Sequence, residues 1–166
     1  LYSAPPVQLA ARGLGELAVA AGFGLLPVCG AAWLQTGQLE LPVLLLSIPV
    51  SCWVANILLI NEVPDADSDA AAGKRTLVVR LGIRGASHLY TGLSLVAFAC
   101  VGFAVITGSL HPLALLLPGM LLPVGLLNGR RIGTSIRQTA DLKPAIEKTL
   151  AIHAAGCLWL ACCPWF

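Results

Sequence analysis

Five long apolar runs constrain the fold of this chain more than any other feature of its sequence. Each run approaches the ~20 residues that an α-helix needs to cross about 30 Å of hydrocarbon. Helices are expected because every backbone N–H and C=O group in hydrocarbon must find a partner within its own segment. We therefore predict an all-α, polytopic transmembrane helical bundle. Its spans are expected near residues 16–36, 41–60, 88–108, 112–128 and 145–163.

The composition supports a membrane protein and argues against other classes. Of the 166 residues, 57% are hydrophobic and only 11% are charged, whereas soluble domains carry about 25% charged residues. The formal net charge of +2 is small, and no basic stripe with interleaved aromatic residues points to nucleic acid. The 6 cysteines all lie in apolar runs without a CxxC pair, so they are expected to be small buried side chains.

The basic residues predict how the bundle is oriented. If the helices alternate in direction, three longer segments (residues 1–15, 61–87 and 129–144) share one side of the membrane, and the turns 37–40 and 109–111 share the other. All 10 Lys and Arg residues lie in the three longer segments, apart from Lys148 just inside the last span. Lys and Arg are enriched in cytoplasmic loops. We expect an inner (plasma) membrane of bacterial type, with the charged segments in the cytoplasm.

The most charged stretch, NEVPDADSDAAAGKRT, covers residues 61–76 and follows the second span directly. Asn61, Asp65 and Asp69 are four positions apart, so on a helix they lie along one face at intervals of about 6 Å. Pro64 interrupts this pattern because it has no N–H for the carbonyl of Ile60. We expect the helix to kink or restart there.

These side chains favour a metal and diphosphate site. Carboxylate and amide oxygens suit Mg²⁺, which is held by a few carboxylates together with phosphate oxygens. The stretch has no His or Cys, which argues against zinc. Lys74 and Arg75 follow at once and could bind a diphosphate. A solvated cytoplasmic loop with a few ion pairs is the plainer alternative.

The next residues predict a short helix at the membrane interface. In residues 77–83 the apolar side chains can share one face while Arg80 turns away. Thr76 is a candidate N-cap and Gly82 a candidate stop. Such a helix could lie on the bilayer or cover a site that opens to the cytoplasm.

Taken together, these motifs resemble a known family. NxxxDxxxD followed by GKRTLVVRLG resembles the second aspartate-rich motif of the membrane-embedded aromatic prenyltransferases, the UbiA superfamily. YSAPPVQLAARGLGE (residues 2–16) is similar to the cytoplasmic loop before that family's fifth helix, and FGLLPVCGAAWLQTG (residues 23–37) to the helix after it. The similarity extends to about residue 153. It is nearest to the 1,4-dihydroxy-2-naphthoate polyprenyltransferase branch, which serves menaquinone synthesis.

The resemblance implies a nine-helix bundle in which two aspartate motifs bind Mg²⁺ and a polyprenyl diphosphate, whose prenyl group passes to an aromatic acceptor. Residues 1–166 would be the C-terminal part of that single domain, with about five of its helices and the site loop 61–87. The resemblance also implies roles for individual residues: Asp65 and Asp69 as catalytic metal-binding residues, Asn61 as a further metal ligand, Lys74 and Arg75 as diphosphate-binding residues, and Tyr2 and Ser3 as pocket residues.

The chain also departs from the family pattern. The first aspartate motif is absent, so we expect a missing N-terminal half and an inactive fragment. Gln8 and Ala10 stand where relatives often carry basic residues. Two other classes stay open: a non-enzymatic membrane bundle that binds or transports cations, and a charged loop that binds no ligand. Against cation transport, Lys74 and Arg75 would repel the cation, and no charged residue lies in the middle of a span.

Overall fold

The computed structural model describes residues 2, 4, 6–134 and 139–162. All regular elements of these residues are helical, which confirms the predicted helical bundle. In chain order they are η1 (Ala10–Arg12), α1 (Gly15–Ala20), the π-helix η2 (Ala21–Leu25), α2 (Leu26–Thr36), α3 (Leu41–Ala71), α4 (Leu77–Ile106), η3 (Pro112–Leu115), α5 (Leu116–Thr134) and α6 (Thr139–Cys162).

Five helical units of the described chain are long and apolar enough to cross a membrane. They are Gly15–Thr36, Leu41–Ala71, Leu77–Ile106, Pro112–Thr134 and Asp141–Cys162. Large apolar side chains remain exposed along them, including Leu17, Phe23 and Ile106. Such surfaces are typical of helices that face lipid or other membrane helices rather than water. The chain is an integral membrane protein.

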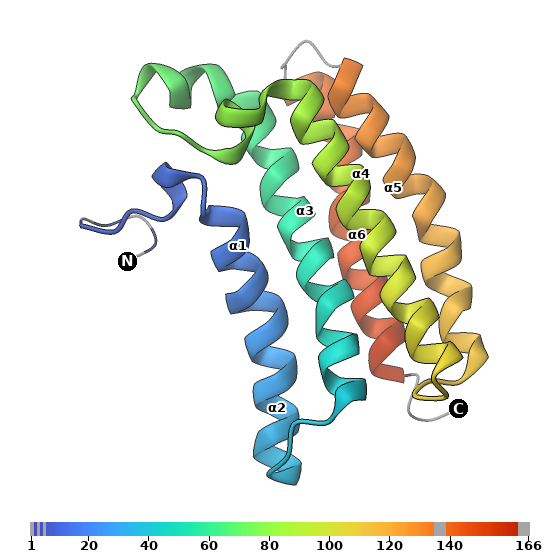
Figure 1. The fold of residues 1–166 in the computed structure, drawn as a ribbon. Helices are drawn as coiled ribbons and strands as arrows, with labels where there is room; N and C mark the ends of the chain where they lie inside the picture. Colours follow the sequence, from blue (N-terminus) through green and yellow to red (C-terminus); the bar gives the residue numbers. More distant parts are fainter. Residues whose placement is uncertain (1, 3, 5, 135–138, 163–166) are drawn as a thin grey trace.

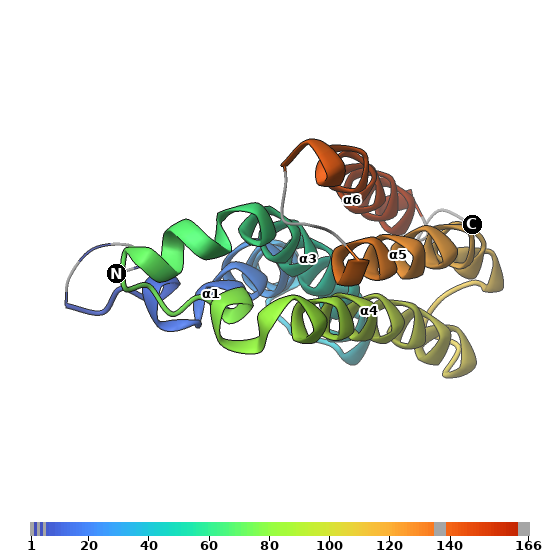
Figure 2. The same ribbon diagram turned by 90° about the horizontal axis from the view of Figure 1, so that it is seen from above.

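Helix α3 is the centre of the bundle. It packs against α4, α6 and the α1–η2–α2 unit, while α5 packs against α4 and α6. Figure 2 shows α6 and α4 on opposite sides of α3 and α5. In Figure 1 the end of α3, the start of α4 and the end of α5 lie at the upper end, and the α2–α3 and α4–α5 turns lie at the lower end. The predicted alternation of helix direction is therefore confirmed.

A glycine allows the N-terminal helical unit to approach α3 closely. A Cβ atom added at Gly24 would collide with the side chain and backbone of Ser51. Gly24 lies in η2, where the helix widens into a π-turn between α1 and α2. The missing side chain thus lets two backbones meet, as small residues do between membrane helices.

A buried polar network joins α4, α5 and α6. The Tyr90 hydroxyl lies 2.6 Å from the Thr149 hydroxyl. Thr149 Oγ1 donates to the carbonyl of Ala145 at 2.8 Å, and Asn128 Nδ2 donates to the same carbonyl at 3.1 Å. These groups are buried, and an unpaired polar group there would cost free energy. The network therefore favours one arrangement of the three helices.

Helix α3 does not restart at Pro64 but continues to Ala71, with Pro49 and Pro64 inside it. The missing N–H of Pro64 costs one helical hydrogen bond. The fully buried side chains of Ile60 and Val63, which belong to one core cluster, hold the helix together across this position. Figure 1 shows the last turns of α3 bending away from the bundle, so the helix changes direction without ending.

The predicted site loop over residues 61–87 is mostly helical. Its first part belongs to α3, which ends at Ala71, and its last part to α4, which begins at Leu77. The predicted interfacial helix is the start of α4. Thr76 is its N-cap, as predicted, and Thr76 Oγ1 accepts from the Val79 N–H at 3.4 Å. Gly82, with φ 67° and ψ 175°, breaks the helical path inside α4; this positive φ favours glycine.

Candidate functional site

The N-terminal segment folds back against the turn between α3 and α4. The Arg75 N–H donates to the carbonyl of Ala11 at 2.8 Å. Gly13, with φ +70°, lies so close that an added Cβ would be 2.8 Å from the carbonyl oxygen of Arg75. The Arg12 guanidinium donates to the carbonyl of Pro6 at 2.9 Å, within the segment itself. Two stretches that are far apart in the sequence therefore form one surface.

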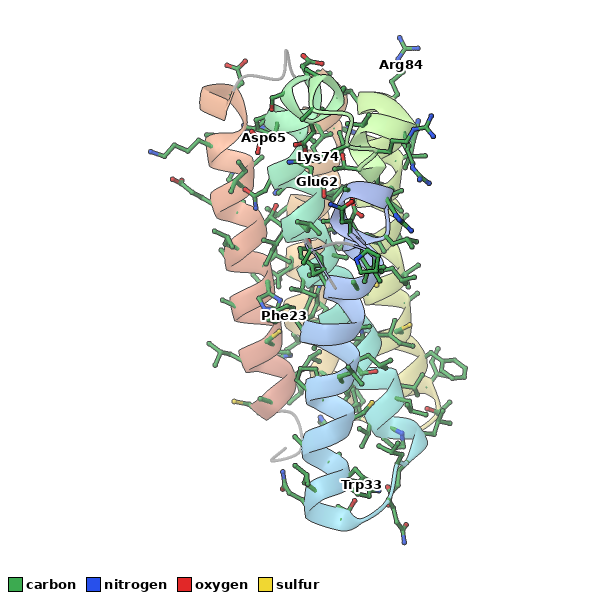
Figure 3. All side chains as sticks on the ribbon, turned by 90° about the vertical axis from the view of Figure 1, so that its left-hand side faces the viewer. Phe23, Trp33, Glu62, Asp65, Lys74 and Arg84 are labelled. Carbon is green, nitrogen blue, oxygen red and sulfur yellow. The ribbon has the colours of Figure 1, made fainter. Side chains whose placement is uncertain are left out.

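A pocket of about 460 Å³ lies between this segment and the charged turn. Its lining residues are Gln8, Ala10, Ala11, Glu62, Asp69, Ala72, Gly73, Lys74 and Thr76. Of the predicted site residues, the pocket thus contains Asp69 and Lys74. Figure 3 shows Glu62, Asp65 and Lys74 at this same end of the bundle.

Lys74 and Asp69 form an ion pair at the pocket. Lys74 Nζ lies 2.7 Å from Asp69 Oδ1, and the Lys74 N–H donates to the Asp69 carbonyl at 2.9 Å. The hydrogen bond to Asp69 and the negative charge of Asp69 raise the pKa of Lys74. Lys74 is therefore held as a cation at the pocket, where an anionic ligand could take over part of its contact with Asp69.

Asn61 and Asp65 lie outside the lining of the pocket, and both are exposed. They share the continuous helix α3 with Asp69, so the spacing of four residues places all three along one helical face. Asn61 Nδ2 donates to the carbonyl of Ile57 at 2.7 Å. The amide oxygen, Asn61 Oδ1, is then the atom that can bind a ligand.

The other predicted site residues are Arg75, Tyr2 and Ser3, and neither Arg75 nor Tyr2 is among the residues that line the pocket. Arg75 contributes its backbone N–H to the contact with Ala11, and its exposed side chain is outside the pocket lining. Burial raises the pKa of Tyr2, and the negative charges of Glu62 and Glu16 raise it further. The Tyr2 hydroxyl therefore lies within electrostatic range of these two carboxyl groups. Ser3 lies outside the described residues.

The donor set fits a divalent cation only as part of a larger ligand shell. Asp65, Asp69 and Asn61 offer hard oxygen atoms, the type that such cations prefer. In the described part of the chain, however, no three His, Cys, Asp or Glu side chains come close enough together to hold a metal. A cation here would need further ligands, and water or phosphate oxygens commonly supply them.

Two acidic residues at the site received no role from the sequence. Glu16, in the first turn of α1, is only 5% exposed. The carboxyl group of Glu62 faces that of Glu16 and also faces the Val78 N–H at the start of α4. The only sequence signal for Glu16 is an acidic residue at the beginning of an apolar span. Its contact with Glu62 depends on how α1 packs against α3.

The fold and the site define the class of this chain: a polytopic membrane protein with an acidic and cationic pocket where its helices end. Residues 1–159 match the UbiA prenyltransferase family. The chain belongs to this family.

Several relatives share one name, 1,4-dihydroxy-2-naphthoate octaprenyltransferase. The chain is 40% identical to that of Haemophilus influenzae over 57% of its own length and 31% of the relative's. It is 32% identical to that of Bacillus subtilis over 68% and 36% of the two chains. It is 30% identical to that of Mycobacterium leprae over 97% and 55%. The chain thus spans between about a third and about half of these relatives. No solved structure matches the chain significantly.

Proposed function

We propose that this chain is the C-terminal part of an enzyme that transfers a polyprenyl group from its diphosphate to an aromatic acceptor. The proposed acceptor is 1,4-dihydroxy-2-naphthoate, in the synthesis of menaquinone, since relatives bear that name. The observation that carries the proposal is the Lys74–Asp69 pair at a pocket where the helices end, in a chain of the UbiA family.

The chemistry of prenyl transfer matches the charges of this site. The bond between the allylic carbon and the diphosphate oxygen breaks, and its electron pair leaves with the diphosphate. An aromatic carbon of the acceptor then forms the new carbon–carbon bond and releases its proton. Negative charge grows on the diphosphate as the bond breaks, and a fixed cation at that place lowers the barrier. Lys74 is that cation, and Asp69 holds it in position.

We further propose that Asn61, Asp65 and Asp69 hold Mg²⁺ together with the diphosphate. The bound ion would neutralise charge on the leaving group. Arg75 would contribute a second, fork-shaped cation once its exposed side chain turns to the diphosphate. The apolar helices below the site would hold the isoprenoid chain and keep water away from the reactive carbon.

The rest of the proposed enzyme is an N-terminal half that carries the other aspartate motif, so the fragment alone is expected to be inactive. The charged end of the bundle would face the cytoplasm of an inner membrane, because the Lys and Arg residues gather at that end. A cation-transport bundle, the alternative class, gains no support from the pocket. Lys74 stands at the pocket and would oppose the entry of a cation.

The test uses the full-length protein in membranes or detergent. We expect lipid extracts to contain a prenylated product when a polyprenyl diphosphate, 1,4-dihydroxy-2-naphthoate and Mg²⁺ are supplied. Asp65→Asn or Asp69→Asn should lower kcat by about 100-fold or more, as does the loss of other groups that stabilise developing charge. Glu147→Gln, at an exposed position on α6, is the matched control and should retain activity. Normal turnover of both Asp variants would refute the proposal.

A further inference from the structure

The carboxyl group of Glu16 is buried without a hydrogen-bond donor. The residue is 5% exposed, and neither Glu16 Oε1 nor Oε2 has a partner among the described residues. A buried polar group without a partner costs free energy, and a charged one costs more. Such a group in a folded protein calls for an explanation, and an absent ligand is one.

Glu16 directs this carboxyl group toward the pocket residue Glu62. The two carboxyl groups face each other, and Glu62 Oε2 is likewise buried without a partner in the described part of the chain. Figure 3 shows Glu62 beside the upper end of α1, the helix that carries Glu16. Glu62 also lines the pocket that contains Lys74 and Asp69. Glu62 therefore belongs to the same site, and Glu16, outside the pocket lining, joins it through Glu62; the two residues are called the acid pair.

The acid pair and Lys74 attract different chemical groups: the acids attract a hydrogen-bond donor, and Lys74 attracts an anion. An ionised carboxylate in a region of low dielectric repels a diphosphate and attracts a hydrogen-bond donor. Lys74 attracts the diphosphate instead. Glu62 also meets the Val78 N–H, whereas both carboxyl oxygens of Glu16 lack a donor in the described part of the chain. A phenolic hydroxyl supplies that donor without adding negative charge.

We propose that Glu16 determines acceptor specificity by accepting a hydrogen bond from a ring hydroxyl of the aromatic acceptor. Glu62 lies next to this hydroxyl, and Lys74 attracts the diphosphate to its own side of the pocket. The inference rests on the proposed function and adds a role for a residue outside the aspartate motif.

The test compares Glu16→Gln and Glu16→Leu with the control Glu40→Gln in the full-length protein, with 1,4-dihydroxy-2-naphthoate as the acceptor. Glu40 is an exposed acid at the opposite end of the bundle. Hydrogen bonds to charged groups are strong enough that Glu16→Leu should raise the KM for the acceptor by about 10- to 100-fold. The KM for the polyprenyl diphosphate should stay nearly unchanged. Glu16→Leu should also discriminate less between this acceptor and a naphthoate that lacks one hydroxyl.

Folding and binding are measured separately from turnover. Thermal unfolding in detergent should show that Glu16→Leu is no less stable than the wild type, since it removes a buried carboxyl group without a partner. The dihydroxynaphthoate alone should raise the Tm of the wild type and of Glu40→Gln, but not that of Glu16→Leu.

Two results would overturn the inference. One is an active wild type whose Glu16 variants keep their acceptor KM and their hydroxyl discrimination. The other is a changed Mg²⁺ requirement with an unchanged acceptor KM, which would make the acid pair a cation site. A wild type that makes no product would instead overturn the proposed function, and the Tm measurement would still decide whether Glu16 binds a phenol.

Discussion

Replacing Thr149 by valine tests the buried network that joins α4, α5 and α6. The change removes one hydroxyl and leaves the side-chain volume almost unaltered. Thr149 is 2% exposed and Tyr90 is 1% exposed. The lost hydroxyl donates to the Ala145 carbonyl at 2.8 Å and therefore accepts from the Tyr90 hydroxyl at 2.6 Å.

The structure predicts unequal costs for the two ends of this hydrogen bond. In Thr149→Val the Tyr90 hydroxyl keeps only Asn128 Nδ2, a donor at 3.5 Å, so its proton has no acceptor in the described structure. A buried donor left without a partner costs about 1–3 kcal/mol. Side-chain hydrogen bonds between membrane helices average about 0.6 kcal/mol and reach about 1.7 kcal/mol. We expect Thr149→Val to lower the free energy of unfolding by about 1–2 kcal/mol.

The opposite change is expected to be milder. In Tyr90→Phe the Thr149 hydroxyl still donates to the Ala145 carbonyl, so no donor loses its only acceptor. A loss below about 1 kcal/mol follows. When Tyr90→Phe is already present, Thr149→Val should cost little more. The double-mutant cycle should therefore give a coupling energy of about 1 kcal/mol between the two residues.

The assay is reversible unfolding in mixed micelles, in which a denaturing detergent is titrated and helix content is followed. Thr107→Val is the matched control, because its hydroxyl is exposed at the end of α4, where solvent can replace its bond to the Phe103 carbonyl. This control should change the free energy by less than about 0.5 kcal/mol. Additive single-mutant costs, or a Tyr90→Phe cost as large as that of Thr149→Val, would refute the reasoning.

Two further predictions concern close packing and the ion pair. Gly24→Ala should destabilise the fold by about 1–3 kcal/mol, because its Cβ collides with Ser51; Gly22→Ala, with no atom within 4 Å of the added Cβ, should be nearly neutral in the same unfolding assay. Asp69→Asn should lower the pKa of Lys74, because the hydrogen bond and charge of Asp69 raise it. The stabilising effect of this raised pKa is complete below the ordinary lysine pKa of about 10.4 and is lost as pH rises through the raised value. The pH dependence of Lys74 acylation, followed by mass spectrometry, should therefore shift to lower pH in Asp69→Asn, and an unchanged profile would contradict the assignment.

Local sequence signals predicted the parts of this protein that depend on local chemistry. Apolar length located all five membrane-crossing units, although α3 and α4 extend well beyond the predicted spans. The N-cap at Thr76 and the helical break at Gly82 were predicted from hydrogen-bonding capacity and conformational freedom, and both are present. A kink or a restart was predicted at Pro64, and the helix bends without ending; the sequence left this choice open because it depends on the packing of Ile60 and Val63 in the core.

The sequence by itself determined a membrane bundle, its alternating direction and a charged segment that places Asp69 close to Lys74, since each of these depends on neighbours along the chain. Only the tertiary structure decided that Asp69 and Lys74 line a pocket with the N-terminal segment while Asn61 and Asp65 lie outside its lining. It also decided that Glu16 meets Glu62. The physical reason is that this contact arises where α1 packs against α3, next to the close approach of Gly24 in η2 to Ser51 in α3. Residue spacing within one helix cannot report a contact between two.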